Sequence, residues 1–179
     1  MRSRIIPVIT IAALLAASGG MVLAAQDKYT LQVPGGLALS EFRGYEDWQT
    51  VSVSQTEDRL KVILANPVMI DAYRAGAHGG GKRFPDGSKI AKIEWKPKEN
   101  AESPFAVNVP DTLDGLGFMV KDSARFPDTG GWGYAQFSYD PASDTYRPNE
   151  EYVGDAKCGD ACHAPVAEKD YVFTAYQKR

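Results

Sequence analysis

The sequence predicts a strand-rich α+β fold, in which an antiparallel sheet carries a few short helices. Short segments with alternating apolar and polar residues recur along the chain, and aromatic and β-branched residues dominate them. This period of two is typical of strands that bury one face. Only a few segments between them carry helix signals. Together these two observations favour a sheet with occasional helices.

The strand pattern is clearest in segment 89–96. There Ala91, Ile93 and Trp95 fall on one face and charged residues fall on the other. The other predicted strands are 49–55, 59–65, 115–120, 133–139 and 171–176.

Two helices are predicted from their start signals. Asn66 can cap a helix in which Pro67 takes the first position, and this helix should run to about Ala75. Ser40 can cap a shorter helix over residues 40–48.

The N-terminus carries the pattern of an export signal. Two arginines precede an apolar run over residues 5–17, and small residues follow up to Ala25. This order is typical of a secretory signal peptide. A retained membrane anchor is the alternative, but Pro7 interrupts the run, which is short for a spanning helix of ~20 residues. We expect residues 1–25 to be removed, which leaves 26–179 as one domain without a membrane attachment.

Charge and motifs exclude several classes of function. The formal net charge is −3, and no cluster of lysines and arginines is visible, so the chain lacks the basic surface that binds nucleic acid or anionic lipid. It also lacks the sequence motifs of serine hydrolases and of phosphate-binding loops.

The two cysteines lie close together, and a histidine follows the second one. The segment reads Cys158-Gly-Asp-Ala-Cys162-His163. Attachment of a c-type haem needs two thiols for the two vinyl groups and a histidine directly after the second thiol to reach the iron. The usual spacing has two residues between the cysteines, whereas three stand here. Gly159 can absorb the extra residue because glycine tolerates unusual backbone angles.

Two alternatives to haem remain open at this point. Cys158 and Cys162 can form a disulfide, because residues four apart on a helical turn have Cα atoms about 6 Å apart, near the upper end of the range for a bridge. The protein would then be a haem-free exported β-domain that acts as a binding or structural module. A zinc site is the other alternative, although it needs four ligands and only three soft ones cluster here.

Further short motifs are spread along the chain, and through them it resembles the cytochrome P-460 family. This family includes hydroxylamine-oxidising mono-haem cytochromes and the gas-binding cytochromes c′-β. The motifs are Phe84-Pro85-Asp86-Gly87 with Lys92, Val120-Lys121-Asp122-Ser123 with Arg125-Phe126, Gly131-Trp132, and Cys162-His163 followed by Asp170-Tyr171-Val172-Phe173-Thr174.

The resemblance implies a periplasmic homodimer with one covalent haem c per chain. By position, Cys158 and Cys162 would hold the haem and His163 would be the proximal iron ligand. The other side of the iron would be open to a small nitrogen-oxide ligand, such as nitric oxide or hydroxylamine. The redox partner stays unidentified.

The resemblance also assigns a role to Lys92. In the hydroxylamine-oxidising members a lysine at this position is bonded to the porphyrin, which implies a cross-link here. The alternative is a solvated strand edge, because Lys92 shares its face with Glu94 and Lys96 and lysines are mostly exposed.

One departure from the family bears on activity. The hydroxylamine-oxidising members place a proton-accepting carboxylate on the open side of the haem, shortly before the motif that matches 120–123. Residues 116–119 contain no acid here, and Phe118 suits a hydrophobic cap over the sixth coordination site. We therefore expect binding or scavenging of nitric oxide in preference to an enzyme that oxidises hydroxylamine.

Other residues could take secondary roles. Arg125 can pair with a haem propionate, since guanidinium binds carboxylates well, or it can form an ordinary surface salt bridge. A simple electron-transfer cytochrome would need a second axial ligand, for which the candidates are Met69, Met119 and His78.

Overall fold

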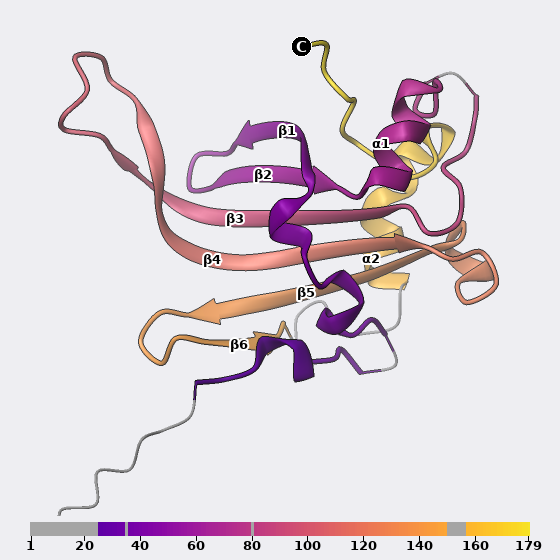
Figure 1. Ribbon diagram of the computed structural model, residues 1–179, viewed down its shortest axis with the longest axis horizontal. Helices are drawn as coiled ribbons and strands as arrows, with labels where there is room; N and C mark the ends of the chain where they lie inside the picture. The colour runs from indigo at the N-terminus through magenta and orange to yellow at the C-terminus, as the bar shows by residue number, and fades with distance from the viewer. Residues whose placement is uncertain (1–24, 35, 80, 150–156) are drawn as a thin grey trace, which may run out of the picture.

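The computed structural model describes residues 25–34, 36–79, 81–149 and 157–179. It contains a six-stranded antiparallel sheet whose strands lie side by side in chain order (Figure 1). The predicted strand-rich α+β class is confirmed. The strands are β1 (Gln49–Gln55), β2 (Leu60–Ala65), β3 (Lys89–Glu99), β4 (Asn108–Lys121), β5 (Trp132–Asp140) and β6 (Thr145–Pro148).

The helices are short. Helix α1 (Pro67–Arg74) begins as predicted, because the Asn66 side chain accepts a hydrogen bond from the backbone N–H of Met69 at 3.1 Å. The second α-helix is α2 (Lys157–His163). The 3-10 helices are η1 (Lys28–Thr30), η2 (Leu39–Phe42), η3 (Tyr45–Asp47), η4 (Pro127–Thr129) and η6 (Ala164–Lys169).

The prediction of one continuous helix over residues 40–48 is wrong. The segment is divided into η2 and η3 by Gly44, whose φ is +81°. A residue in the left-handed region cannot continue a right-handed helix, so the chain turns at Gly44 and starts again.

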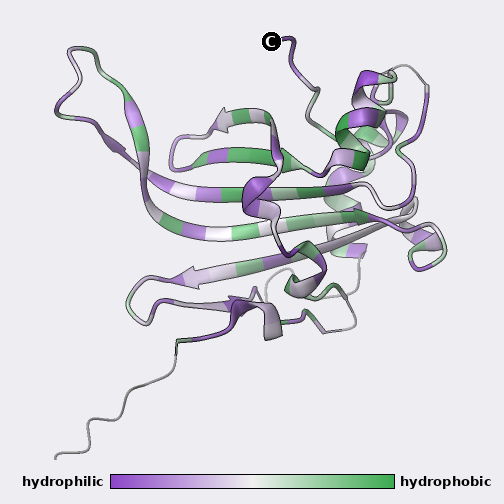
Figure 2. Cartoon of the chain, in the orientation of Figure 1, coloured by the Kyte–Doolittle hydropathy of each residue, from purple (hydrophilic) through white to green (hydrophobic). Residues whose placement is uncertain are grey.

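Different parts of the chain cover the two faces of the sheet. The N-terminal segment crosses one face of the sheet (Figure 1). Its apolar side chains pack there on those of β3, β4 and β5. Helices α1 and α2 and the C-terminal residues lie against the other face. Hydrophobic residues recur along the strands among hydrophilic ones (Figure 2), as expected for strands whose side chains alternate between the faces.

The pairing register decides which side chains share a face. Lys92 of β3 lies opposite Gly117 of β4 and Ile63 of β2, so these three residues belong to one face. Their chain neighbours Ala91 and Phe118 belong to the other, which the N-terminal segment covers.

The strand predicted over residues 171–176 does not form, and that prediction is wrong. The backbone carbonyls of this segment accept hydrogen bonds from side chains in place of a neighbouring strand: His163 contacts Tyr171 O, His78 contacts Val172 O, and Tyr73 donates to Thr174 O. The φ of Tyr171 is +64°, which is incompatible with an extended strand.

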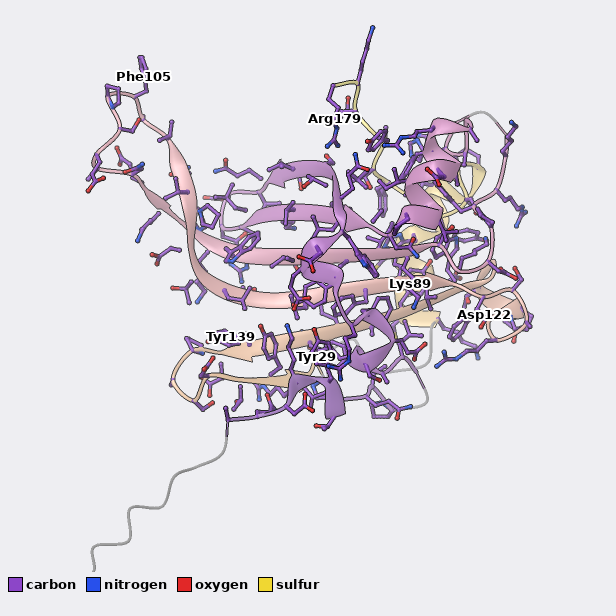
Figure 3. The ribbon with its side chains drawn as sticks, viewed as in Figure 1. Tyr29, Lys89, Phe105, Asp122, Tyr139 and Arg179 are labelled. Carbon is purple, nitrogen blue, oxygen red and sulfur yellow. The ribbon has the colours of Figure 1, made fainter. Side chains whose placement is uncertain are left out.

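The hairpin that joins β3 and β4 extends beyond the rest of the sheet (Figure 1). Phe105 lies near its tip (Figure 3) and is 76 % exposed.

Residues 1–24 of the expected signal peptide lie outside the described residues. None of the helices in the described part of the chain has both the length and the hydropathy that a membrane span requires.

Candidate functional site

Helix α2 presents the two cysteines and His163 together. Cys158 and Cys162 are four residues apart, which places both side chains on one face of the helix. Both are free thiols and both are exposed. His163 is the last residue of α2, so the helix delivers three groups with affinity for metals or electrophiles to one location.

Gly159 allows this helix to lie against the sheet. A Cβ atom at position 159 would come within 2.2 Å of Cγ of Tyr134 on β5, so any larger residue would push α2 outward. Gly159 lies within the helix and has no positive φ. Its role is therefore a close approach to the Tyr134 ring, which differs from the backbone role predicted from the spacing of the cysteines.

The orientation of His163 leaves one ring nitrogen available. Its Nδ1 lies 2.7 Å from the backbone oxygen of Tyr171. A carbonyl oxygen only accepts hydrogen bonds, so Nδ1 carries the proton and Nε2 keeps its lone pair. The ring is flanked by those of Tyr134 and Phe173, with centroids 5.0 and 4.9 Å away.

The surroundings of His163 favour its neutral form. Burial lowers the pKa of His163 below its ordinary value, the hydrogen bond to Tyr171 opposes this effect, and the nearby ammonium of Lys92 adds to it. A neutral imidazole is the form that binds a metal ion.

A cavity of about 420 Å³ lies between α2, the C-terminal segment and the sheet. Its size is within the range of small-molecule and cofactor sites, roughly 300–1,000 Å³. Side chains and backbone from β2, β3, β4 and β5 form one wall, and both cysteines and His163 reach it from the opposite side. The lining residues are Lys61, Ile63, Ile90, Lys92, Glu94, Gly117, Phe118, Met119, Tyr134, Ala135, Gln136, Cys158, Gly159, Cys162, His163, Val172, Phe173 and Thr174.

Charged side chains form a linked group on the sheet wall of this cavity. Lys92 Nζ lies 3.0 Å from Glu94 Oε2, and Lys61 Nζ lies 3.4 Å from Glu94 Oε1. Glu94 is only 7 % exposed, and a buried carboxylate requires such partners. The face that carries Lys92 and Glu94 is therefore a cavity wall, which differs from the solvated edge considered in the sequence.

Glu94 is the site residue that sequence reasoning missed. Its spacing of two from Lys92 on a strand was the available signal, because alternate residues share a face. It supplies the cavity with a carboxylate, although the stretch 116–119 has none.

The structure does not bring every predicted residue to the cavity. Phe118 contributes to the wall, but its ring stacks on Phe42 with centroids 4.3 Å apart, in the cluster on the opposite face. Its expected role as a cap over the open coordination site is therefore corrected: the alternation along β4 turns Met119 toward the cavity and the Phe118 ring away from it.

Arg125 also lies apart from the cavity. Its guanidinium donates to Glu41 at 2.7 and 3.2 Å and to the backbone oxygen of Gly36 at 3.2 Å. The expected contact with a haem propionate is thus corrected to the alternative, a salt bridge. The ring nitrogen of His78 is similarly engaged, by Val172 O at 2.9 Å.

The chemistry of the cavity fits a haem. Two free thiols on one helix face suit its two vinyl groups, and Nε2 of His163 suits its iron. Tyr134 lines the cavity beside His163, and its buried Oη has no hydrogen-bond partner among the described residues. A directly bound metal fits less well, because no group of three or more His, Cys, Asp or Glu side chains in the described ranges is arranged to hold an ion.

Comparison with known proteins gives one finding that agrees with this geometry. The sequence model of the cytochrome P460 family matches residues 42–174, a span that includes the six strands, the two α-helices and the cavity-lining residues named above. No curated protein matches the chain.

Proposed function

The chain belongs to the cytochrome P460 family, and from this premise we propose that it is an exported mono-haem c-type cytochrome that binds nitric oxide. The family indicates a haem cofactor. Attachment to Cys158 and Cys162, ligation by His163 and a periplasmic location are our proposals. When bound, the haem would supply an iron that holds the small ligand and exchanges electrons.

The observation that carries this proposal is the hydrogen bond from His163 Nδ1 to Tyr171 O. It fixes the tautomer in which Nε2 can bind iron, as partners of metal-binding histidines usually do. The same helix offers both thiols beside the cavity. Each thiol would add across one vinyl group, with sulfur on one carbon and hydrogen on the next, so that no atom is released.

The ion pairs of Glu94 favour binding of nitric oxide over conversion of hydroxylamine. Oxidation of hydroxylamine requires a group that accepts protons, and Glu94 is the carboxylate on the cavity wall. Its two oxygens already face the ammonium groups of Lys92 and Lys61. Conversion of hydroxylamine is therefore our second candidate, and Glu94 would be its proton acceptor.

A bond between Lys92 and the porphyrin would distinguish conversion of hydroxylamine from binding of nitric oxide. Lys92 Nζ is held on the cavity wall by Glu94, so it would be available to a porphyrin bound in the cavity. A bond from Nζ to a porphyrin carbon would replace one N–H and one C–H, so it would remove two hydrogens and require a two-electron oxidant. Intact mass would therefore be two hydrogens lower than the sum of chain and haem.

The experiment that tests the proposal is an absorption spectrum of the protein exported from a host with haem c maturation machinery. A covalent haem with an ordinary five-coordinate spectrum, together with tight nitric-oxide binding by the reduced form, would support the binding function. A strongly red-shifted Soret band with the loss of two hydrogens would support the Lys92 cross-link and the oxidase. In that case Glu94→Gln should abolish turnover of hydroxylamine and leave nitric-oxide affinity within a few-fold of its original value.

A protein without haem would overturn the proposal and favour the disulfide module. Intact mass with and without reductant distinguishes the two, because reduction of a Cys158–Cys162 disulfide adds two hydrogens. The same mass measurement on the exported protein would also show whether residues 1–25 have been removed.

We also propose that the protein is a homodimer and that the exposed hairpin tip contributes to its contact. Phe105 is 76 % exposed and Val107 39 % exposed, and burial of such apolar side chains would stabilise an interface. Sedimentation velocity should show a dimer that Phe105→Ser weakens. A monomer at all concentrations would contradict this assignment.

A further inference from the structure

The hydrogen bond from His163 Nδ1 to Tyr171 O depends on an unusual backbone conformation at Asp170 and Tyr171. Asp170 and Tyr171 have φ values of +54° and +64°. The left-handed region is uncommon for non-glycine residues and rare for one as bulky as tyrosine. Two such residues in succession persist only where the surroundings hold them, and such strain is concentrated at functional sites. Here the result is that the Tyr171 carbonyl points at Nδ1 of His163.

A buried ion pair holds this turn. Lys121 Nζ lies 2.7 Å from Asp170 Oδ1, and each side chain is only 3 % exposed. The second carboxylate oxygen of Asp170 accepts the backbone N–H of Phe84 at 2.8 Å. Arg83 Nη1 also lies 4.0 Å from Asp170 Oδ1, and the Arg83 side chain is largely exposed. Asp170 is thus anchored to β4 and to the segment that precedes β3.

Lys121 also holds Gly130, the residue on which the Tyr171 ring packs. Lys121 Nζ also donates to Gly130 O at 2.7 Å. The Tyr171 ring packs so closely on Gly130 that a Cβ atom there would lie 2.3 Å from the ring. Lys121 therefore contacts both the residue before Tyr171 and the residue beneath its ring, which leaves the carbonyl little freedom to rotate.

We propose that Lys121 and Asp170 are a positioning pair for the proximal histidine: they hold the Tyr171 carbonyl against Nδ1 of His163 and thereby set the donor strength of Nε2. This inference rests on the proposed function, in which His163 is the iron ligand. A firm hydrogen bond at Nδ1 makes the imidazole a more basic ligand, and a more basic ligand stabilises ferric iron relative to ferrous iron. The pair should therefore lower the reduction potential of the haem.

The test compares Asp170→Asn and Lys121→Met with Asp114→Asn in the exported protein. Asp114 pairs with Arg59 at the same distance, 2.7 Å, but at a location outside the cavity wall where the two side chains are 32 % and 27 % exposed, so it controls for the loss of a surface ion pair. The measurements are the reduction potential and the solvent exchange of the His163 Nδ1 proton, followed by NMR in the diamagnetic ferrous carbon-monoxide form. The two histidines are distinguishable, because His78 carries its proton on Nε2 and His163 on Nδ1.

We expect both pair variants to raise the reduction potential and to speed solvent exchange of the Nδ1 proton relative to the original protein, because a less firmly held carbonyl is a weaker partner for the ligand. Asp114→Asn should leave both unchanged. If the pair variants lower only the melting temperature and retain the original potential and exchange rate, the pair is merely structural and the inference is overturned. If the protein purifies without haem, the proposed function fails, and the exchange rate in that protein alone decides whether the pair positions Tyr171.

Discussion

The side chain of Lys92 lies across Gly117 of the neighbouring strand. A Cβ atom at position 117 would be 3.0 Å from Cε of Lys92, and the two residues are direct partners in the pairing of β3 with β4. The absence of a side chain on Gly117 gives Lys92 room to lie along the cavity wall, where its Nζ meets Glu94.

A change at Gly117 should therefore act on Lys92. In Gly117→Ala the added methyl group meets only the flexible end of a lysine, so we expect a cost in the free energy of unfolding of about 1 kcal/mol or less. In Gly117→Val the larger side chain should displace Lys92 into the cavity and reduce the amount of haem bound per chain. The ratio of haem to protein absorbance checks this, and an unchanged ratio in the valine variant would contradict the proposed path of Lys92.

The packing of Gly159 on Tyr134 gives a stronger expectation. A Cβ atom at 159 would meet Cγ and Cβ of Tyr134 at 2.2 and 2.5 Å, which are parts of the side chain that cannot move without the strand. Gly159→Ala should therefore lower the free energy of unfolding by roughly 1–3 kcal/mol and reduce haem attachment. Ala161→Ser on the exposed side of α2 is the control, and urea unfolding is the measurement. Equal stability of the two variants would show that α2 is not held against β5.

The site was predictable from the sequence where its chemistry is local. Cys158, Cys162 and His163 are close in the chain, so their spacing alone indicated one site. Lys92 and Glu94 are also neighbours, but whether their face was solvent or a cavity wall depended on α2 and the C-terminal segment, which come from more than 60 residues away in the sequence.

The errors came from features that local patterns do not contain. The ring of Phe118 was assigned to the wrong side because its face depends on the pairing of β4 with β3, and strand order and register are set by the whole sheet. Residues 171–176 have the composition of a strand, yet three of their carbonyls are taken by the side chains of His163, His78 and Tyr73. The oxygen that orients His163 belongs to the backbone of Tyr171, and backbone atoms leave no residue-specific signal.

The ion pair of Glu41 with Arg125 should make stability depend on pH in the acidic range. Burial alone would raise the pKa of Glu41, but hydrogen bonds from Arg125 and from the backbone N–H of Ala38 outweigh it and hold the pKa below the ordinary value of 4.5. The unfolded chain therefore takes up this proton at a higher pH than the folded chain does. The stabilisation is complete above the unfolded value and disappears as the pH falls through the folded one.

Glu41→Gln removes this contribution. We expect the variant to be less stable than the original protein near neutral pH and to approach it as the pH falls below about 4. Urea unfolding at several pH values measures the difference, and the exposed residue Glu99 supplies the control variant Glu99→Gln. A difference between Glu41→Gln and the original protein that stays constant with pH would show that the carboxylate does not titrate with folding.

Met119 is a candidate for a second axial ligand, which would close the sixth coordination site of the iron. It lies on the cavity wall, and a methionine thioether is an axial ligand in electron-transfer cytochromes. In the sheet it pairs directly with Tyr134, whose ring centroid lies 5.0 Å from that of His163, and under the proposed binding function we expect the Met119 thioether not to bind the iron. Met119→Leu conserves volume and removes the sulfur, and it should cost less than about 1.5 kcal/mol in stability. The reduced spectrum and the nitric-oxide affinity should then match those of the original protein. A change from a six-coordinate to a five-coordinate spectrum in this variant would instead assign Met119 as the second ligand and the protein to electron transfer.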